Sequence, residues 1–181
     1  MGGCQGTNTL KLTNLPVRDE VTVAPVVNAT GRPLLLPPDN PLAALRQEFG
    51  VGNEALVTVP DVLRNRFLLA FQTHGYQVTN IDPVRPIFSS QSTDIVRVLK
   101  EAQGAGFKGL VVLATLHRWD DSRWGSLRVV FVSIDITLAR VSDSKILDVG
   151  VLRDQAVPVG AATTIVQATD DAARWLAERL F

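Results

Sequence analysis

An α+β fold, a mixed β-sheet with helices packed on it, is predicted by three features of this 181-residue chain. Segments with strand or helix periodicity occur in the order β-α-α-β-α-β-β-β-α. Three of the strand segments follow one another with short polar stretches between them, which is typical of an antiparallel meander. The last segment, residues 163–180, has its apolar residues on one helical face. Hydrophobic residues make up 46% of the chain and charged residues 20%, which indicates a single globular domain.

The first half of the domain alternates short strands and helices. Its predicted elements are a strand at 20–27, a helix at 41–49, a helix between 58 and 75, a strand at 76–81 and a helix between 92 and 104. Pro25 inside the first strand favours an edge or a bulge. Thr58 and Asp61 have the spacing of a capping box, and Gly75 ends the helix that they begin. Ser92 is the predicted cap of the next helix.

The second half is dominated by three predicted strands, at 110–116, 127–140 and 145–156. The first is continuously apolar, as expected of a strand that is covered on both faces. The second alternates, and its even-numbered residues would face the core. Its opposite face holds Val129 and Phe131 and is less polar than exposure to water predicts. Either a helix or another subunit would cover that face.

Charge and cysteine content exclude several classes of function. Eighteen basic and eighteen acidic residues cancel, so broad electrostatic attraction to nucleic acid or anionic lipid is not expected. One cysteine cannot form an intramolecular disulfide, and no run approaches the roughly 18 apolar residues of a membrane span. Gly104 and Gly106 end a helix, whereas a phosphate-binding loop must open one. No metal or cofactor site is predicted.

Residues 1–18 are polar and lack sustained periodicity, which predicts a flexible leader before a domain over residues 19–181. The only cysteine, Cys4, lies in this leader, after two glycines. It could be an incidental thiol. It also resembles the small-small-Cys end of a bacterial lipoprotein signal, in which the cysteine is acylated, for example with palmitate, and becomes the first mature residue. A tether of about 14 residues would have a mean reach of roughly 20 Å.

Four stretches resemble a domain of bacterial envelope lipoproteins. They are V-T-V-A-P-V-V-N at 21–28, G-Y-Q-V at 75–78, the apolar run at 109–119 and the paired strands at 127–150. The domain occurs in the amino-terminal part of TolB, in CsgG-like curli secretion lipoproteins and in PelC-like polysaccharide export lipoproteins. The resemblance covers residues 20–180. It implies a periplasm-facing envelope protein that binds partners or assembles into oligomers.

The densest polar stretch is H-R-W-D-D-S-R-W at 117–124. A pocket near His117, Asp120 and Asp121 could bind a small molecule or hydrolyse it. In a regular strand, however, His117 and Asp120 point to opposite faces, and a metal site needs three or four ligands. The favoured interpretation is a hairpin loop that carries a recognition surface of tryptophan and arginine. Its residues are Trp119, Arg123 and Trp124.

Three adjacent leucines in the proline-rich loop at 31–40 form an apolar patch: Leu34, Leu35 and Leu36. Apolar side chains cost free energy when they are left in water. They would either fold back on the core or contact another protein or the membrane surface.

These features predict a non-enzymatic cell-envelope lipoprotein, anchored through Cys4, that is an accessory or assembly component of an export, transport or cell-wall machine. It would act through envelope protein partners and self-association. Gln5 is not the aspartate that retains lipoproteins at the inner membrane, so the outer membrane is favoured. The candidate surface comprises Leu34, Leu35, Leu36, Trp119, Arg123, Trp124 and Phe131. The alternatives are the pocket near His117, Asp120 and Asp121, and a cytoplasmic protein whose cysteine has no role.

Overall fold

The computed structural model describes residues 9–16, 19–37, 57–79, 87–88, 91–124, 127–159 and 164–181. Its strands are β1 (Glu20–Val23), β2 (Val27–Asn28), β3 (Gln77–Val78), β4 (Leu110–Trp124), β5 (Leu127–Arg140) and β6 (Lys145–Val159). Its helices are α2 (Val59–Thr73), α3 (Ile95–Gly104) and α4 (Ile165–Glu178). The predicted helix at 41–49 lies outside the described residues.

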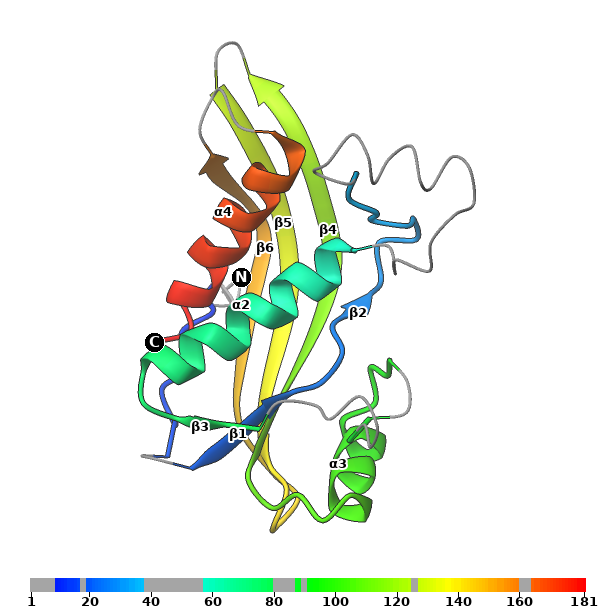
Figure 1. Cartoon of the computed structure of the whole chain (residues 1–181), viewed down its shortest axis with the longest axis vertical. Coiled ribbons are helices and arrows are strands. Elements are labelled where there is room, and N and C mark those ends of the chain that lie inside the picture. The colour runs from blue at the N-terminus through cyan, green and yellow to red at the C-terminus, as the bar shows by residue number, and fades with distance from the viewer. Residues whose placement is uncertain are drawn as a thin grey trace, which may run out of the picture.

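The strands form one mixed sheet in the order β3-β1-β4-β5-β6 (Figure 1). Strands β1 and β3 are parallel, β1 and β4 are parallel, and β4, β5 and β6 form an antiparallel meander. The predicted α+β class is therefore confirmed. Strand β2 also pairs with β4, farther along it than β1 does. Pro25 lies between β1 and β2 and splits the predicted first strand, because proline has no N–H to donate to a ladder.

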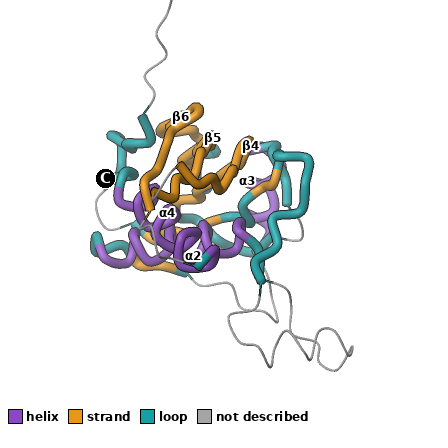
Figure 2. Tube along the Cα trace, turned by 90° about the horizontal axis from the view of Figure 1, so that it is seen from above, coloured by secondary structure: helices purple, strands orange, loops and turns teal. Residues whose placement is uncertain are grey.

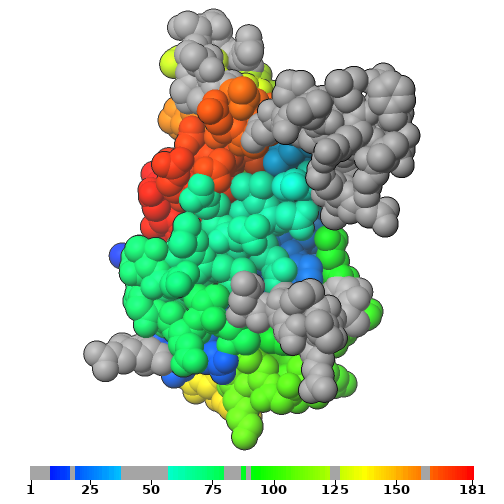
Figure 3. Space-filling model, in the orientation of Figure 1, coloured from blue at the N-terminus to red at the C-terminus, as the bar shows by residue number. Residues whose placement is uncertain are grey.

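Helices α2 and α4 lie side by side on one face of the sheet (Figures 1 and 3). Arg66 of α2 joins them, since its Nε donates to Oδ1 of Asp170 in α4 at 2.6 Å. Helix α3 packs on the opposite face, over Val111 and Ala139 near the start of β4. Figure 2 shows α2 and α4 together on one side of β4, β5 and β6. No helix of the described chain covers the rest of the opposite face.

The predicted capping box begins α2. Asp61 N donates to the Thr58 hydroxyl at 3.3 Å, and Thr58 N donates to the Asp61 carboxylate at 2.9 Å. The prediction for α3 was wrong, because its cap is Asp94 rather than Ser92. The Asp94 carboxylate accepts from Val96 N at 2.9 Å, inside the helix. The Ser92 hydroxyl accepts from Asp94 N at 3.1 Å, before the helix begins.

Thr58→Ala is expected to lower the free energy of unfolding by about 1 kcal/mol, because the first turn of α2 loses its side-chain acceptor. Thr73→Ala is the matched control. Its hydroxyl donates to the Leu69 carbonyl of the same helix, a bond that does not stabilise a helix, so the cost should be close to zero. Urea unfolding followed by circular dichroism measures both, and equal losses would contradict the capping argument.

Residues 9–16, which we call the N-terminal segment, pack against the domain, although the sequence predicts a flexible leader over 1–18. Leu10 and Leu12 are only 2% and 3% exposed and belong to the main core. Leu12 N donates to the Leu180 carbonyl at 2.8 Å. The ordered domain therefore begins before residue 19. Two alternating leucines in a polar stretch are too short a pattern to reveal this in the sequence.

Asp148 of β6 holds the N-terminal segment in place. Its Oδ2 accepts from Thr13 N at 2.6 Å and from Asn14 N at 3.1 Å. Burial by itself would raise the pKa of Asp148, but these two bonds, with those from Val149 N and the Thr13 hydroxyl, together hold the pKa below its usual range. Because the folded pKa is depressed, the stabilisation is present above the unfolded pKa and is lost as the pH falls through the folded pKa.

Acid is therefore expected to loosen the N-terminal segment as the pH falls below about 4, the usual pKa of an aspartate in an unfolded chain. Asp148→Asn should cost about 1 kcal/mol and remove this acid dependence. Hydrogen-exchange protection factors of the Thr13 and Asn14 amides measure the effect. Asp143→Asn, in the exposed turn between β5 and β6, is the matched control and should leave both amides protected. An unchanged acid dependence in Asp148→Asn would contradict the assignment.

Candidate interaction surface

The sheet has an open face, which we define as the part turned away from α2 and α4 that α3 does not cover. It is built by the second half of β4, the middle of β5 and the facing part of β6. Its residues are Thr115, His117, Arg118, Asp120, Phe131, Ser133, Asp135, Val149, Arg153 and Asp154. The sequence predicts that either a helix or another subunit covers this face of β5. Among the described residues, no helix covers it.

Two β-bulges flank Ser133 on the open face. The register of β4 shifts at His117, between Leu116 and Arg118. The register of β6 shifts opposite Ser133, where Asp154 has a φ of 48° and its N–H donates to the Ser133 hydroxyl at 2.9 Å. An extra residue reverses the alternation of a strand. His117 and Asp120 therefore share the open face, and their predicted placement on opposite faces was wrong.

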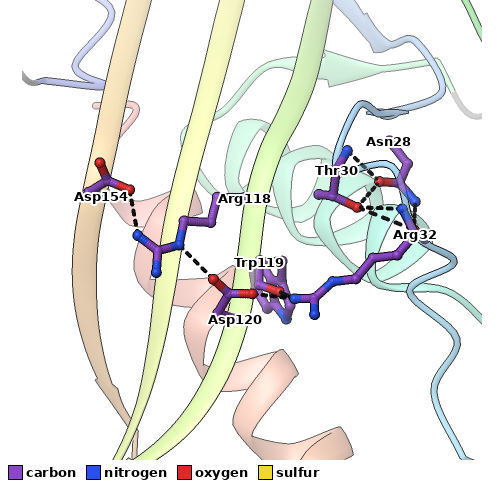
Figure 4. A network of polar contacts seen from close by, with 7 residues as sticks. All are labelled: Asn28, Thr30, Arg32, Arg118, Trp119, Asp120 and Asp154. Carbon is purple, nitrogen blue, oxygen red and sulfur yellow. Dashed lines mark hydrogen bonds and ion pairs between the residues drawn. The ribbon is translucent and has the colours of Figure 1, made fainter.

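One charge network runs from the loop after β2 across β4 to β6 (Figure 4). Asp120 pairs with Arg32 and accepts from Arg118 Nε at 2.6 Å. Arg118 Nη1 also donates to Asp154 at 2.7 Å, and its guanidinium carbon lies 5.2 Å from the centroid of the Phe131 ring. The hydrogen bond from Arg118 holds the pKa of Asp120 below its usual range.

A second network centres on Asp135 of β5. His117 Nε2 lies 2.9 Å from Asp135 Oδ2, and Arg153 pairs with the other carboxylate oxygen. Burial would raise the pKa of Asp135, but the hydrogen bonds from Arg153 and His117 lower it further than burial raises it. A carboxylate that is held ionised by arginine is a poor general acid. Together the two networks join three arginines, Arg32, Arg118 and Arg153, to three aspartates, Asp120, Asp135 and Asp154.

A groove of about 290 Å³ lies beside the open face, between the loop after β2, the start of α4 and β4. It brings the predicted leucine patch together with Trp119, Asp120 and Asp121. The leucine loop is held by two backbone bonds, from Leu36 N to the Val57 carbonyl at 3.0 Å and from Val59 N to the Leu34 carbonyl at 2.9 Å.

The sequence predicts that the three leucines either fold back on the core or remain available for contact, and the structure shows both. Leu36 is 7% exposed and Leu34 packs against the core, so these two fold back. Leu35 is 51% exposed and lines the groove, together with Ile165, which is 38% exposed. The groove therefore has an apolar wall that is open to solvent.

Trp119 does not lie at a loop tip, because β4 continues to Trp124 and pairs with β5 throughout. Trp119 is 4% exposed and belongs to the core, so it forms the base of the groove rather than a projecting contact. Phe131 is half-buried beneath Arg118. Cys4 and the side chains of Arg123 and Trp124 lie outside the described residues.

Of the predicted pocket residues, the structure brings Asp120 and Asp121 together in the groove but leaves His117 outside it. Asp121 pairs with Arg128, whose Nε donates to its Oδ1 at 2.7 Å, and it lies opposite Val130, whose side chain faces the helices. His117 lies on the open face and does not line the groove. Among the described residues, no three histidine, cysteine, aspartate or glutamate side chains are grouped to hold a metal ion.

The sequence reveals only part of this surface. Arg32 is 88 residues from its partner Asp120, and no local pattern links them. Arg153 and Asp154 were also missed, because the bulge in β6 hides which face each occupies. None of the described helices has the length and apolar character needed to cross a membrane.

Comparison with models of known protein families gave no match, and comparison with curated proteins gave none either. Solved structures do match. Two crystal structures of the PelC dodecamer from Paraburkholderia phytofirmans align with a TM-score of 0.52 and 12% identity, over 93% of this chain and 90% and 91% of PelC. Lipoprotein GNA1162 from Neisseria meningitidis aligns with a TM-score of 0.39 and 14% identity, over 80% of this chain and 85% of its own. This chain therefore has a fold similar to that of PelC, one of the three groups that the sequence resembles.

Proposed function

We propose that the protein is a non-enzymatic lipoprotein of the bacterial cell envelope, anchored through Cys4 and facing the periplasm. It would be an accessory or assembly component of an export, transport or cell-wall machine, and would act through contacts with envelope proteins and with further copies of itself. The outer membrane is the favoured address, since Gln5 follows the cysteine.

The open face is the observation that carries this proposal. Arg118 and Arg153 on this face, with Arg32 of the adjacent loop after β2, balance the three aspartates. These are Asp120, Asp135 and Asp154, and the half-buried ring of Phe131 lies beside Arg118. Balanced charge around an apolar centre suits a protein contact, because each charge can exchange one partner for another without leaving a net charge buried. The fold likeness to PelC, which was solved as a dodecamer, supports self-association.

Self-association is tested by light scattering on the full chain over a range of concentrations. An oligomer is expected, and Phe131→Asp should reduce it to monomers, because the contact would lose its apolar centre and gain a carboxylate that upsets the balance of charge. Leu69→Asp, on the outer side of α2 where Leu69 is 47% exposed, is the matched control and should leave the oligomer intact. A strict monomer at high concentration would count against this part of the proposal.

The anchor is tested by mass spectrometry of the precursor produced in a bacterium. Acyl chains on Cys4 are expected, and Cys4→Ser should abolish them. An unmodified cysteine in the native host would remove the anchor and favour the cytoplasmic alternative.

The small-molecule or hydrolytic alternative has one supporting observation, the groove that Asp120 and Asp121 both line. Asp121→Asn separates it from the leading proposal, because Asp121 lines the groove and does not lie on the open face. The variant should leave oligomer size and partner capture unchanged if the surface acts by contact. Loss of a hydrolytic activity in this variant would instead support the enzyme.

A further inference from the structure

The N-terminal segment determines which side of the domain lies nearest Cys4. Its backbone joins the domain at Thr9, whose carbonyl accepts from Val151 N at 3.0 Å. Cys4 precedes Thr9 by only five residues, and an extended chain spans at most about 3.6 Å per residue, so the two are at most about 18 Å apart. A domain of this length has a radius of gyration of about 16 Å. An anchor at Cys4 therefore cannot let the domain turn freely, and the surface around Thr9 must stay beside the bilayer.

That surface is a polar groove of about 350 Å³ between the N-terminal segment, β6 and the end of α4. Lys11, Glu178 and Arg179 line it and are exposed, and Trp175, which also lines it, is partly buried. The Arg179 guanidinium carbon is 3.3 Å from the centroid of the Trp175 ring. Tryptophan and arginine together are typical of the layer where lipid headgroups meet the acyl chains. Lysine and arginine there bind lipid phosphates.

We propose that this groove is the membrane-contact surface of the anchored protein, and that Lys11 and Arg179 bind lipid phosphates while Trp175 sits at headgroup depth. The proposal rests on the anchor at Cys4. It also gives the N-terminal segment a role, because its docking orients the domain and leaves the open face free for protein partners.

Cys4 is the only cysteine in the chain, so it can be coupled specifically to a maleimide phospholipid. The full chain is then attached to nanodiscs whose lipids carry bromine near the headgroup end of the acyl chains, which quenches nearby tryptophan fluorescence. Quenching is expected, and Trp175→Phe should remove at least half of it. Trp119→Phe is the matched control, since Trp119 lines the other groove, and should retain the quenching.

Two double variants test the roles of Lys11 and Arg179 and leave every tryptophan in place. The double variant Lys11→Glu, Arg179→Glu should lower the quenching of tryptophan fluorescence at least twofold on nanodiscs that contain phosphatidylglycerol. Lys100→Glu with Lys108→Glu reverses two exposed charges around α3 and should leave quenching unchanged. Absent quenching, or quenching that none of these variants alters, would overturn the proposal. The tether is supplied chemically, so this outcome is distinct from a failure of acylation, which mass spectrometry of the native precursor decides.

Discussion

Leu12→Ala is expected to lower the free energy of unfolding by about 3 kcal/mol. Leu12 is 3% exposed and packs into the core that the sheet shares with α2 and α4. Removing its isobutyl group loses the burial of that group and leaves a cavity, since the surrounding helices and strands are too well packed to collapse into it. Urea unfolding of the full chain measures the cost.

Leu35→Ala is the matched control, because it makes the same chemical change at a side chain that is 51% exposed. Its cost should stay below about 1 kcal/mol. Leu12→Ala should also weaken the docking of the N-terminal segment and so lengthen the tether beyond Cys4. Hydrogen exchange at the Leu12 amide, which donates to the Leu180 carbonyl, reports this directly. If residues 9–16 instead formed the flexible leader that the sequence predicts, Leu12→Ala would lower the free energy of unfolding by no more than Leu35→Ala does.

Gly109→Ala is expected to cost about 3 kcal/mol as well, for a different reason. Gly109 lies just before β4, where the backbone of β1 passes close to it. An added Cβ would overlap the Glu20 carbonyl oxygen and lie 2.9 Å from the Glu20 carbonyl carbon. Backbone atoms of a paired strand cannot move aside without disturbing the adjacent pairing of Val21 with Leu110.

Gly104→Ala is the control for this variant. Gly104 is the last residue of α3, and an added Cβ there would meet no atom within 4 Å. Alanine has the higher helix propensity, so the change should be neutral or slightly stabilising. Thermal unfolding of both variants gives the comparison. A Gly109→Ala protein as stable as Gly104→Ala would mean that β1 and β4 are farther apart than described.

Elements whose signals are local were predictable. The capping box of Thr58 and Asp61 depends on atoms three residues apart, so it can be recognised before the fold is known. The alternation in β5 likewise separates its core face from its opposite face, and the structure places Val130 and Ile134 in the core as predicted. The resemblance to PelC-like proteins was drawn from the order of the predicted helices and strands. That order is a local property, which is why the resemblance agrees with the observed fold.

The candidate surface was predictable only in pieces. The leucine loop and the stretch at 117–124 were both singled out, yet the sequence contains no sign that they line one groove. The bulge at His117 changes which residues share a face, and it arises from the pairing of β4 with β5. Arg32 and Asp120 meet only because β2 pairs with β4 and so places the loop after β2 beside Trp119.

The sequence by itself determined most of the helices and strands, the order in which they follow one another and the face that most of them bury, because periodicity and capping depend on near neighbours along the chain. Tertiary structure alone decided the strand register, the two bulges, the docking of residues 9–16 and the partners of each charge. These depend on hydrogen bonds and packing between segments that are far apart in sequence, and a shift of one residue in a strand reverses every face it presents.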